Sequence, residues 1–295
     1  MNTRIAVWFF LPLIAVVSCT LVVDVDVPIA EPKITVNSLF SPDSVWDVSL
    51  TLSRNILDEA PFMIPNVSEV VILDETEKIV STLSQTKPGV YRSDSKPEMG
   101  KTYTVRVGVP NQHSITATGK IPGPVEVIQV KIDTLEVKQD YGPGQSIAIE
   151  VELRDPANEI NYYRFQLYIR AVYEYYRYDT QETVRDTTTI QLGLLEDSPD
   201  LLGEGNPNFI ISDSKFNGRT AIITFKPIYP WSVQIIEAGI LTQNLSEEYY
   251  KYLTTLDLQR RTDGDPFAQP VKVYSNINNG FGIFAGYSAS YFRIN

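Results

Sequence analysis

The sequence is poor in the residues on which most catalytic and metal-binding chemistry depends. Its 295 residues include one cysteine, Cys19, and one histidine, His113. A lone cysteine excludes a disulfide within the chain, and a lone histidine excludes zinc sites built from several imidazoles. No Gly-x-Ser-x-Gly segment accompanies His113, and no spacing among the 36 Asp and Glu residues singles out a hydrolytic carboxylate pair. The sequence therefore predicts no enzyme, no metal site and no cofactor.

Basic residues are also too few for a partner that carries many phosphates. Lys and Arg number 25 against 36 Asp and Glu, so the formal net charge is −11 at pH 7. Binding to nucleic acid relies on clustered basic side chains that displace counterions. Nucleic acid and anionic membrane surfaces are therefore poor partners for this chain.

The apolar run at the start of the chain is too short to span a bilayer, which takes about 20 residues. It covers residues 5–17, follows Arg4 and leads through small residues to Cys19. Such a segment is typical of a secretory signal peptide, and a cysteine at the cleavage point indicates a bacterial lipoprotein signal. We expect a signal peptide over 1–18 and a lipidated tether over 19–32. The alternative is an ordinary signal peptide that happens to end in cysteine.

Alternation of apolar and polar residues with period two is the main pattern of the remaining chain. In one segment Tyr103, Val105 and Val107 share a face while Thr104 and Arg106 lie opposite. This pattern is typical of half-buried strands. Turn residues separate many short segments of this kind, which favours an antiparallel, mostly β protein.

The order of these segments predicts two domains. We expect an N-terminal immunoglobulin-like antiparallel β-sandwich over 33–118 and, after a linker over 119–124 with two prolines and two glycines, a larger antiparallel β-sandwich domain over 125–295. The larger domain should carry one α-helix near 247–260, which Ser246 can cap and whose ends bear charges that suit the helix dipole.

Two Asn-Gly pairs predict tight turns between strands. Asn217-Gly218 should join segments 209–212 and 219–225 in a hairpin, and Asn279-Gly280 should lie between the last two strands. Gly282 sits among aromatic residues just beyond, which suggests that the backbone packs closely there.

The longest strand candidate runs over 162–178 and has two different faces. One face alternates as an ordinary core face, and the other mixes tyrosine with arginine, the residue types enriched at interface hot spots. The candidate binding residues are Tyr162, Arg164, Tyr168, Arg170 and Tyr176. The alternative is a solvated face whose tyrosines pair across strands. The acidic segment 196–208 matches no EF-hand spacing, and whether it binds an ion stays open.

Several segments together carry a resemblance to a known family. They are Ser18-Cys19, Pro32–Asn37, Tyr162–Phe165, Ser246–Leu253, Pro270–Ile277 and Gly280–Phe284. The chain resembles a family of Bacteroidota outer-membrane lipoproteins catalogued as domain of unknown function 4249. The resemblance covers nearly the whole mature chain, and the C-terminal segment is its most specific part. It implies the same mostly β fold and carries over no catalytic residues.

The resemblance also implies a partner and a location. Such lipoproteins accompany TonB-dependent outer-membrane receptors, so we expect a lipid-anchored accessory subunit of a nutrient-uptake complex. It would face the cell exterior and bind an unknown small ligand or peptide. The sequence departs from this resemblance in one respect. Surface-exported lipoproteins of this phylum carry an acidic cluster immediately after the cysteine, whereas here Asp24 and Asp26 follow Cys19 at a distance and are separated from each other. The alternative is a solitary structural or adhesive cell-surface lipoprotein. The O-glycosylation pattern of the phylum resembles the surroundings of Ser44, Thr134 and Thr187.

Overall fold

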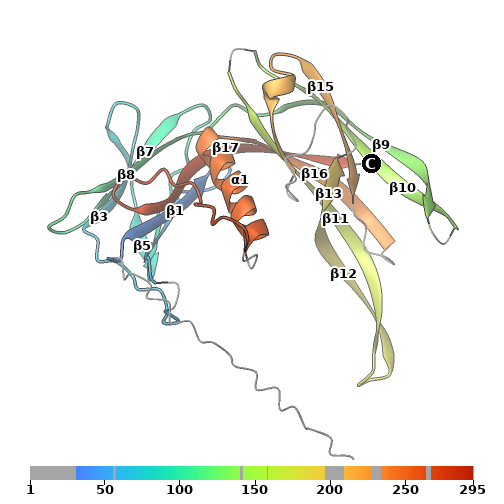
Figure 1. The fold of residues 1–295 in the computed structure, drawn as a ribbon, viewed down its shortest axis with the longest axis horizontal. Helices are drawn as coiled ribbons and strands as arrows, with labels where there is room; N and C mark the ends of the chain where they lie inside the picture. Colours follow the sequence, from blue (N-terminus) through green and yellow to red (C-terminus); the bar gives the residue numbers. More distant parts are fainter. Residues whose placement is uncertain are drawn as a thin grey trace, which may run out of the picture. The chain divides into compact units, whose positions relative to one another are not determined.

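Three β-sheets make up most of the part of the chain that the structure describes, and one of them runs through both halves of the chain (Figure 1). The structure is a computed structural model. It describes residues 31–55, 58–139, 142–157, 159–196, 209–227, 234–263 and 267–294. The prediction of a mostly β protein with antiparallel sheets is confirmed, and the chain from Pro32 onward forms one compact unit.

The first eight strands form a sandwich of two antiparallel layers. These strands are β1 (Ile34–Phe40), β2 (Asp47–Leu52), β3 (Glu69–Leu73), β4 (Ile79–Thr82), β5 (Ser84–Lys87), β6 (Val90–Arg92), β7 (Thr102–Gly108) and β8 (Ile115–Lys120). One layer has the order β1-β2-β6-β5 and the other β4-β3-β7-β8. Immunoglobulin-type sandwiches place their strands in this order when an extra edge strand joins the second layer. The order supports an immunoglobulin-like arrangement, which stays a prediction because β17 extends the first layer beyond β1.

Alternating side chains from both layers meet in one aromatic core. Tyr103, Val105 and Val107 of β7 are buried, as their period predicts. Trp46 packs edge-on against Tyr103 with ring centroids 4.9 Å apart, and Phe284 lies 4.5 Å from Phe40. Phe284 comes from the C-terminal strand, so the first core depends on the last part of the chain.

The second half of the chain forms another sandwich with its own core. Its strands are β9 (Glu126–Gln139), β10 (Gly142–Arg154), β11 (Tyr162–Arg177), β12 (Glu182–Leu192), β13 (Leu194–Glu196), β14 (Ile210–Ser212), β15 (Thr220–Pro227), β16 (Gln234–Leu245) and β17 (Phe281–Ile294). One sheet has the order β13-β15-β10-β9, and the facing part of the large sheet has the order β12-β11-β16-β17, with β14 also on β11. The buried face of β11 supplies Tyr163, Phe165, Leu167 and Ile169 to this core, as the alternation predicts.

Strand β17 joins the two sandwiches into one sheet. It pairs antiparallel with β16 and parallel with β1, where Val36 lies opposite Gly282. Gly282 has φ +107°, and a Cβ there would overlap the carbonyl oxygen of Val36. Only glycine fits this position, which confirms the expected close backbone packing.

The helix α1 (Glu247–Thr262) covers the face of this sheet that the second core leaves open (Figure 1). Ser246 caps it, because its Oγ accepts a hydrogen bond from the Tyr249 backbone N at 3.3 Å. Tyr249 is buried, and Tyr252 and Leu253 pack on the same cluster. The predicted helix and its cap are confirmed. Among the described residues, no helix has the length and hydropathy needed to cross a membrane.

Both predicted Asn-Gly hairpins are wrong. β14 pairs with β11, and β15 pairs with β10 and β13, so the segments on either side of Asn217-Gly218 do not pair with each other. A short 3₁₀ helix (Asp213–Lys215) intervenes, and only Gly218 has a positive φ, whereas a type I′ turn needs two such residues. Before Asn279 the residues 267–277 form no strand. The side chain of Asn276, rather than its backbone, pairs with the backbone of Phe284 in β17: Nδ2 donates to the carbonyl oxygen at 2.7 Å, and Oδ1 accepts from the backbone N at 3.0 Å.

The predicted linker over 119–124 is held at both ends. Gly119 and Lys120 are the last residues of β8, and Ile121 is buried in the first core. The Gly123 carbonyl oxygen accepts hydrogen bonds from Ser288 Oγ at 2.7 Å and Asn244 Nδ2 at 3.1 Å. The domain boundary at this segment stays a prediction.

Candidate functional site

Helix α1 covers the beginning of the tyrosine and arginine face of β11. The ring of Tyr162 stacks on Tyr250 of the helix with centroids 4.3 Å apart. Arg164 Nη1 donates to Gln243 Oε1 and to Tyr249 Oη, each at 3.4 Å. Burial raises the pKa of Tyr249, so its hydroxyl stays protonated at neutral pH. Tyr162 and Arg164 therefore help to attach the helix to the sheet.

The other three candidate residues of β11 lie farther along the strand. Tyr168 is half-buried, Arg170 is exposed, and Tyr176 is 49% exposed near the end of the strand. The structure thus divides the five predicted residues between a helix contact and an open surface. Arg170 and Tyr176 are the members of the set that are most exposed.

Beyond Val172 the strands β11 and β12 continue as a two-stranded ribbon. Strand β16 pairs with β11 as far as Val172, whereas β12 pairs with it as far as Arg177. Among the described residues, the pairs from Tyr173 with Asp186 to Arg177 with Glu182 have no third strand. In Figure 1 this hairpin extends away from the sheets. We call residues 173–186 the ribbon.

Tyrosines dominate the surface of the ribbon. Tyr173 and Tyr175 stack with centroids 5.6 Å apart, and Tyr176 meets Tyr178 edge-on at 5.1 Å. Tyr178 is 86% exposed. A cross-strand ion pair, Arg185 to Glu174 at 2.9 Å, helps to hold the two strands together. The ribbon therefore presents clustered aromatic surface to solvent, and tyrosines of this kind are common anchors in protein interfaces.

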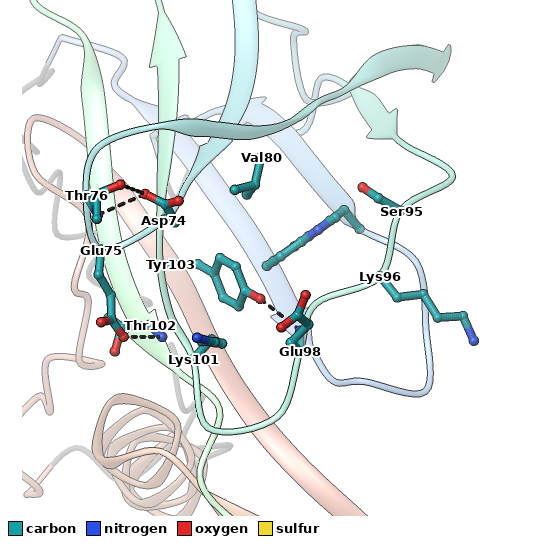
Figure 2. Close-up of a pocket in the computed structure, with 11 residues that line it drawn as sticks. Asp74, Glu75, Thr76, Val80, Ser95, Lys96, Glu98, Lys101, Thr102 and Tyr103 are labelled. Atoms are coloured by element: carbon teal, nitrogen blue, oxygen red, sulfur yellow. Dashed lines mark hydrogen bonds between the residues drawn. The ribbon is translucent and has the colours of Figure 1, made fainter.

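A separate pocket opens at one end of the first sandwich (Figure 2). It has a volume of about 420 Å³ and is lined by the turn after β3, by Val80 and by the segment that leads into β7. Trp46 and Tyr103 contribute its aromatic floor. Tyr103 Oη accepts a hydrogen bond from the Glu98 backbone N at 2.8 Å, which fixes the loop on that side.

Carboxylates surround this pocket on two sides. Figure 2 shows Asp74 and Glu75 on one side of Tyr103 and Glu98 on the other. Asp74 Oδ1 accepts hydrogen bonds from Thr76 Oγ1 at 2.7 Å and from Thr76 N at 2.8 Å, and the side-chain bond lowers the pKa of Asp74. Lys96 and Lys101 also line the pocket, so its rim carries charges of both signs. An aromatic floor with such a rim suits a ligand with an apolar face and polar groups. No local pattern in the sequence indicates this pocket, because its walls come from segments that are far apart in the chain.

The remaining predicted sites have varied outcomes. Ser44 and Thr187 are exposed, and Thr134 lies in β9. His113 is exposed. Cys19 and nearly all of the acidic segment 196–208 lie outside the described residues. No group of three or more His, Cys, Asp or Glu side chains that could hold a metal occurs in the part of the chain that the structure describes.

The fold and these surfaces define a mostly β protein built from two sandwiches, with a pocket in the first and a projecting tyrosine-rich ribbon on the second. The family model described as Domain of unknown function (DUF4249) matches residues 21–293. The chain belongs to this family. No curated protein matches it.

Proposed function

We propose that this protein is a lipid-anchored outer-membrane binding protein that serves as the accessory subunit of a TonB-dependent nutrient-uptake complex. Membership of the DUF4249 family supports the resemblance on which this expectation rests. The segment that ends at Cys19 supports a lipid anchor, because it has the composition of a lipoprotein signal. The protein would face the cell exterior, where the receptor meets its substrate.

The ribbon is the observation that carries this proposal. An isolated two-stranded hairpin is marginally stable in water, and this one keeps several tyrosines exposed. A tyrosine side chain carries roughly 150–250 Å² of surface. Tyr175, Tyr176 and Tyr178 are 38, 49 and 86% exposed, so together they can bury about 350 Å² in an interface. That is a little under half of the roughly 800 Å² that each partner contributes to a standard interface. We assign the receptor contact to the ribbon.

Affinity capture from outer membranes tests this assignment. The full chain, tagged after Asn295, is extracted in mild detergent, and the proteins that accompany it are identified and quantified by mass spectrometry. We expect a TonB-dependent β-barrel receptor in near-equal amount. The double variant Tyr176→Ser/Tyr178→Ser should capture at least about tenfold less receptor, because loss of each hot-spot tyrosine weakens the binding free energy by on the order of 1 kcal/mol or more.

A matched control separates loss of the ribbon contact from general loss of exposed aromatic surface. Phe267 is 95% exposed and lies outside the ribbon, so Phe267→Ser should capture receptor as the unsubstituted protein does. Equal capture by the ribbon variant would refute the ribbon assignment. Recovery of the intact, folded protein without any receptor would refute the uptake role and favour a solitary structural or adhesive lipoprotein.

A further inference from the structure

An apolar loop lies exposed on the first sandwich. The side chains of Phe62, Met63 and Ile64 are 55, 60 and 42% exposed. The loop backbone is attached to β2, because Leu52 N donates to the Met63 carbonyl oxygen at 2.8 Å. Single apolar residues are common on protein surfaces, whereas contiguous ones mark interaction surfaces. The loop therefore presents an apolar surface in a fixed position.

This loop lies where the chain enters the first sandwich. Ser53 N donates to the Lys33 carbonyl oxygen at 2.8 Å, and Lys33 N donates to Ser53 Oγ at 2.9 Å. The next residue, Arg54, places its guanidinium carbon 4.3 Å from the ring centroid of Phe62. Lys33 Nζ lies 5.4 Å from the ring centroid of Phe281, which is also exposed. We call this surface the tether-end patch: Lys33, Arg54, Phe62, Met63, Ile64 and Phe281.

We propose that the tether-end patch docks on the lipid bilayer that holds the anchor, an inference that rests on the proposed lipidation of Cys19. Pro32 follows Cys19 by thirteen residues in the sequence. Thirteen residues span at most about 45 Å when fully extended, so the anchor keeps this end of the sandwich near the membrane surface. Tethering raises the effective concentration of a weak site to about the millimolar range. A few apolar side chains then suffice for docking.

The chemistry of the tether-end patch fits the boundary between lipid headgroups and acyl chains. Apolar side chains insert at this depth, while lysine and arginine keep their charged ends among the headgroups. Both charged members of the patch are cationic in a chain of net charge −11. Asp58 and Glu59 precede the loop and are exposed, so attraction to anionic lipid contributes little. Docking is therefore carried by apolar contact and occurs on a zwitterionic bilayer.

Quenching by brominated lipid tests the docking. The full-length acylated protein, with Phe62→Trp, is reconstituted into phosphatidylcholine vesicles with and without brominated acyl chains. We expect the emission of the added tryptophan, after subtraction of the unsubstituted protein, to fall about twofold or more in brominated vesicles, because a ring at the acyl boundary contacts the bromines. Met63→Trp should behave in the same way and serves as a second reporter.

The control places the reporter on the ribbon. Tyr178→Trp replaces an aromatic residue that is 86% exposed and should show no quenching by brominated lipid. If the protein is acylated by intact mass and floats with the vesicles, but neither patch reporter is quenched more than this control, the docking inference fails and the proposed uptake role is unaffected. If intact mass shows no acyl chains, the lipid anchor and the docking inference fail together.

Discussion

Replacing Gly282 by alanine tests the join between the two sandwiches. The φ of +107° costs a residue with a side chain about 1–3 kcal/mol. The added Cβ would also overlap the Val36 carbonyl oxygen, so β1 and β17 must separate locally. Each ladder hydrogen bond that weakens costs about 1 kcal/mol. Alanine also restricts the unfolded chain more than glycine does, which offsets the loss of stability by about 0.4–1 kcal/mol.

With two weakened ladder bonds, these contributions predict a loss of about 2–4.5 kcal/mol for Gly282→Ala. This loss corresponds to a fall in Tm of roughly 10 °C for a chain of this size. Thermal unfolding followed by circular dichroism measures the change.

Substitutions of two further glycines separate the backbone cost of Gly282→Ala from the cost of the steric overlap. Gly100 has φ +75° and open space around its Cβ position, so Gly100→Ala should show the backbone cost alone, about 1 kcal/mol. Gly286 has no positive φ, but a Cβ there would overlap the Lys120 carbonyl oxygen, so Gly286→Ala should show the overlap cost alone. If Gly282→Ala destabilises the protein no more than Gly100→Ala does, the parallel pairing of β1 with β17 is refuted.

Two predictions concern buried polar groups of the second sandwich. Tyr163 Oη donates to Asp155 in the interior, so Tyr163→Phe should lower the free energy of unfolding by about 1.5–3 kcal/mol, measured by urea denaturation; a change below about 0.5 kcal/mol would contradict a bond to a buried carboxylate. Asp213 is buried, and burial raises the pKa of its carboxyl above the unfolded value. The stability due to this group is therefore largest at low pH and is lost as pH rises through the folded pKa. Relative to Asp213→Asn, the unsubstituted protein should be more stable at pH 4, close to the ordinary carboxyl pKa, than at pH 8, and an equal difference in stability at both pH values would contradict the raised pKa.

Local patterns in the sequence were enough to predict the individual elements. The alternation in β7 and in the first part of β11 predicted which side chains are buried, because neighbours two residues apart share a face of a strand. Ser246 predicted the start of α1, because a cap hydrogen bond joins residues only three apart. These interactions join residues that are close in the sequence, so a local sequence pattern is enough to predict them.

The same local logic failed where a turn depends on its surroundings. Asn217-Gly218 has the composition of a hairpin turn, yet the strands on either side find other partners. The sequence places tyrosine and arginine on one face of β11 and predicts a single binding face there, whereas in the structure α1 contacts Tyr162 and Arg164 and leaves the ribbon open. The local preference of a segment for a turn or strand is a weak signal when strands elsewhere in the fold provide better pairing partners.

The sequence by itself determined the mostly β class, the capped helix and the segment that ends at Cys19, because composition and short periods encode them. Only the tertiary structure decided that β17 pairs with β1 across more than 240 residues, that Asp74 and Glu98 face one pocket, and that Phe62 lies at the point where the chain enters. These features depend on which strands meet, and any strand of suitable alternation can pair with any other. The complete core, rather than a local pattern, selects among those pairings.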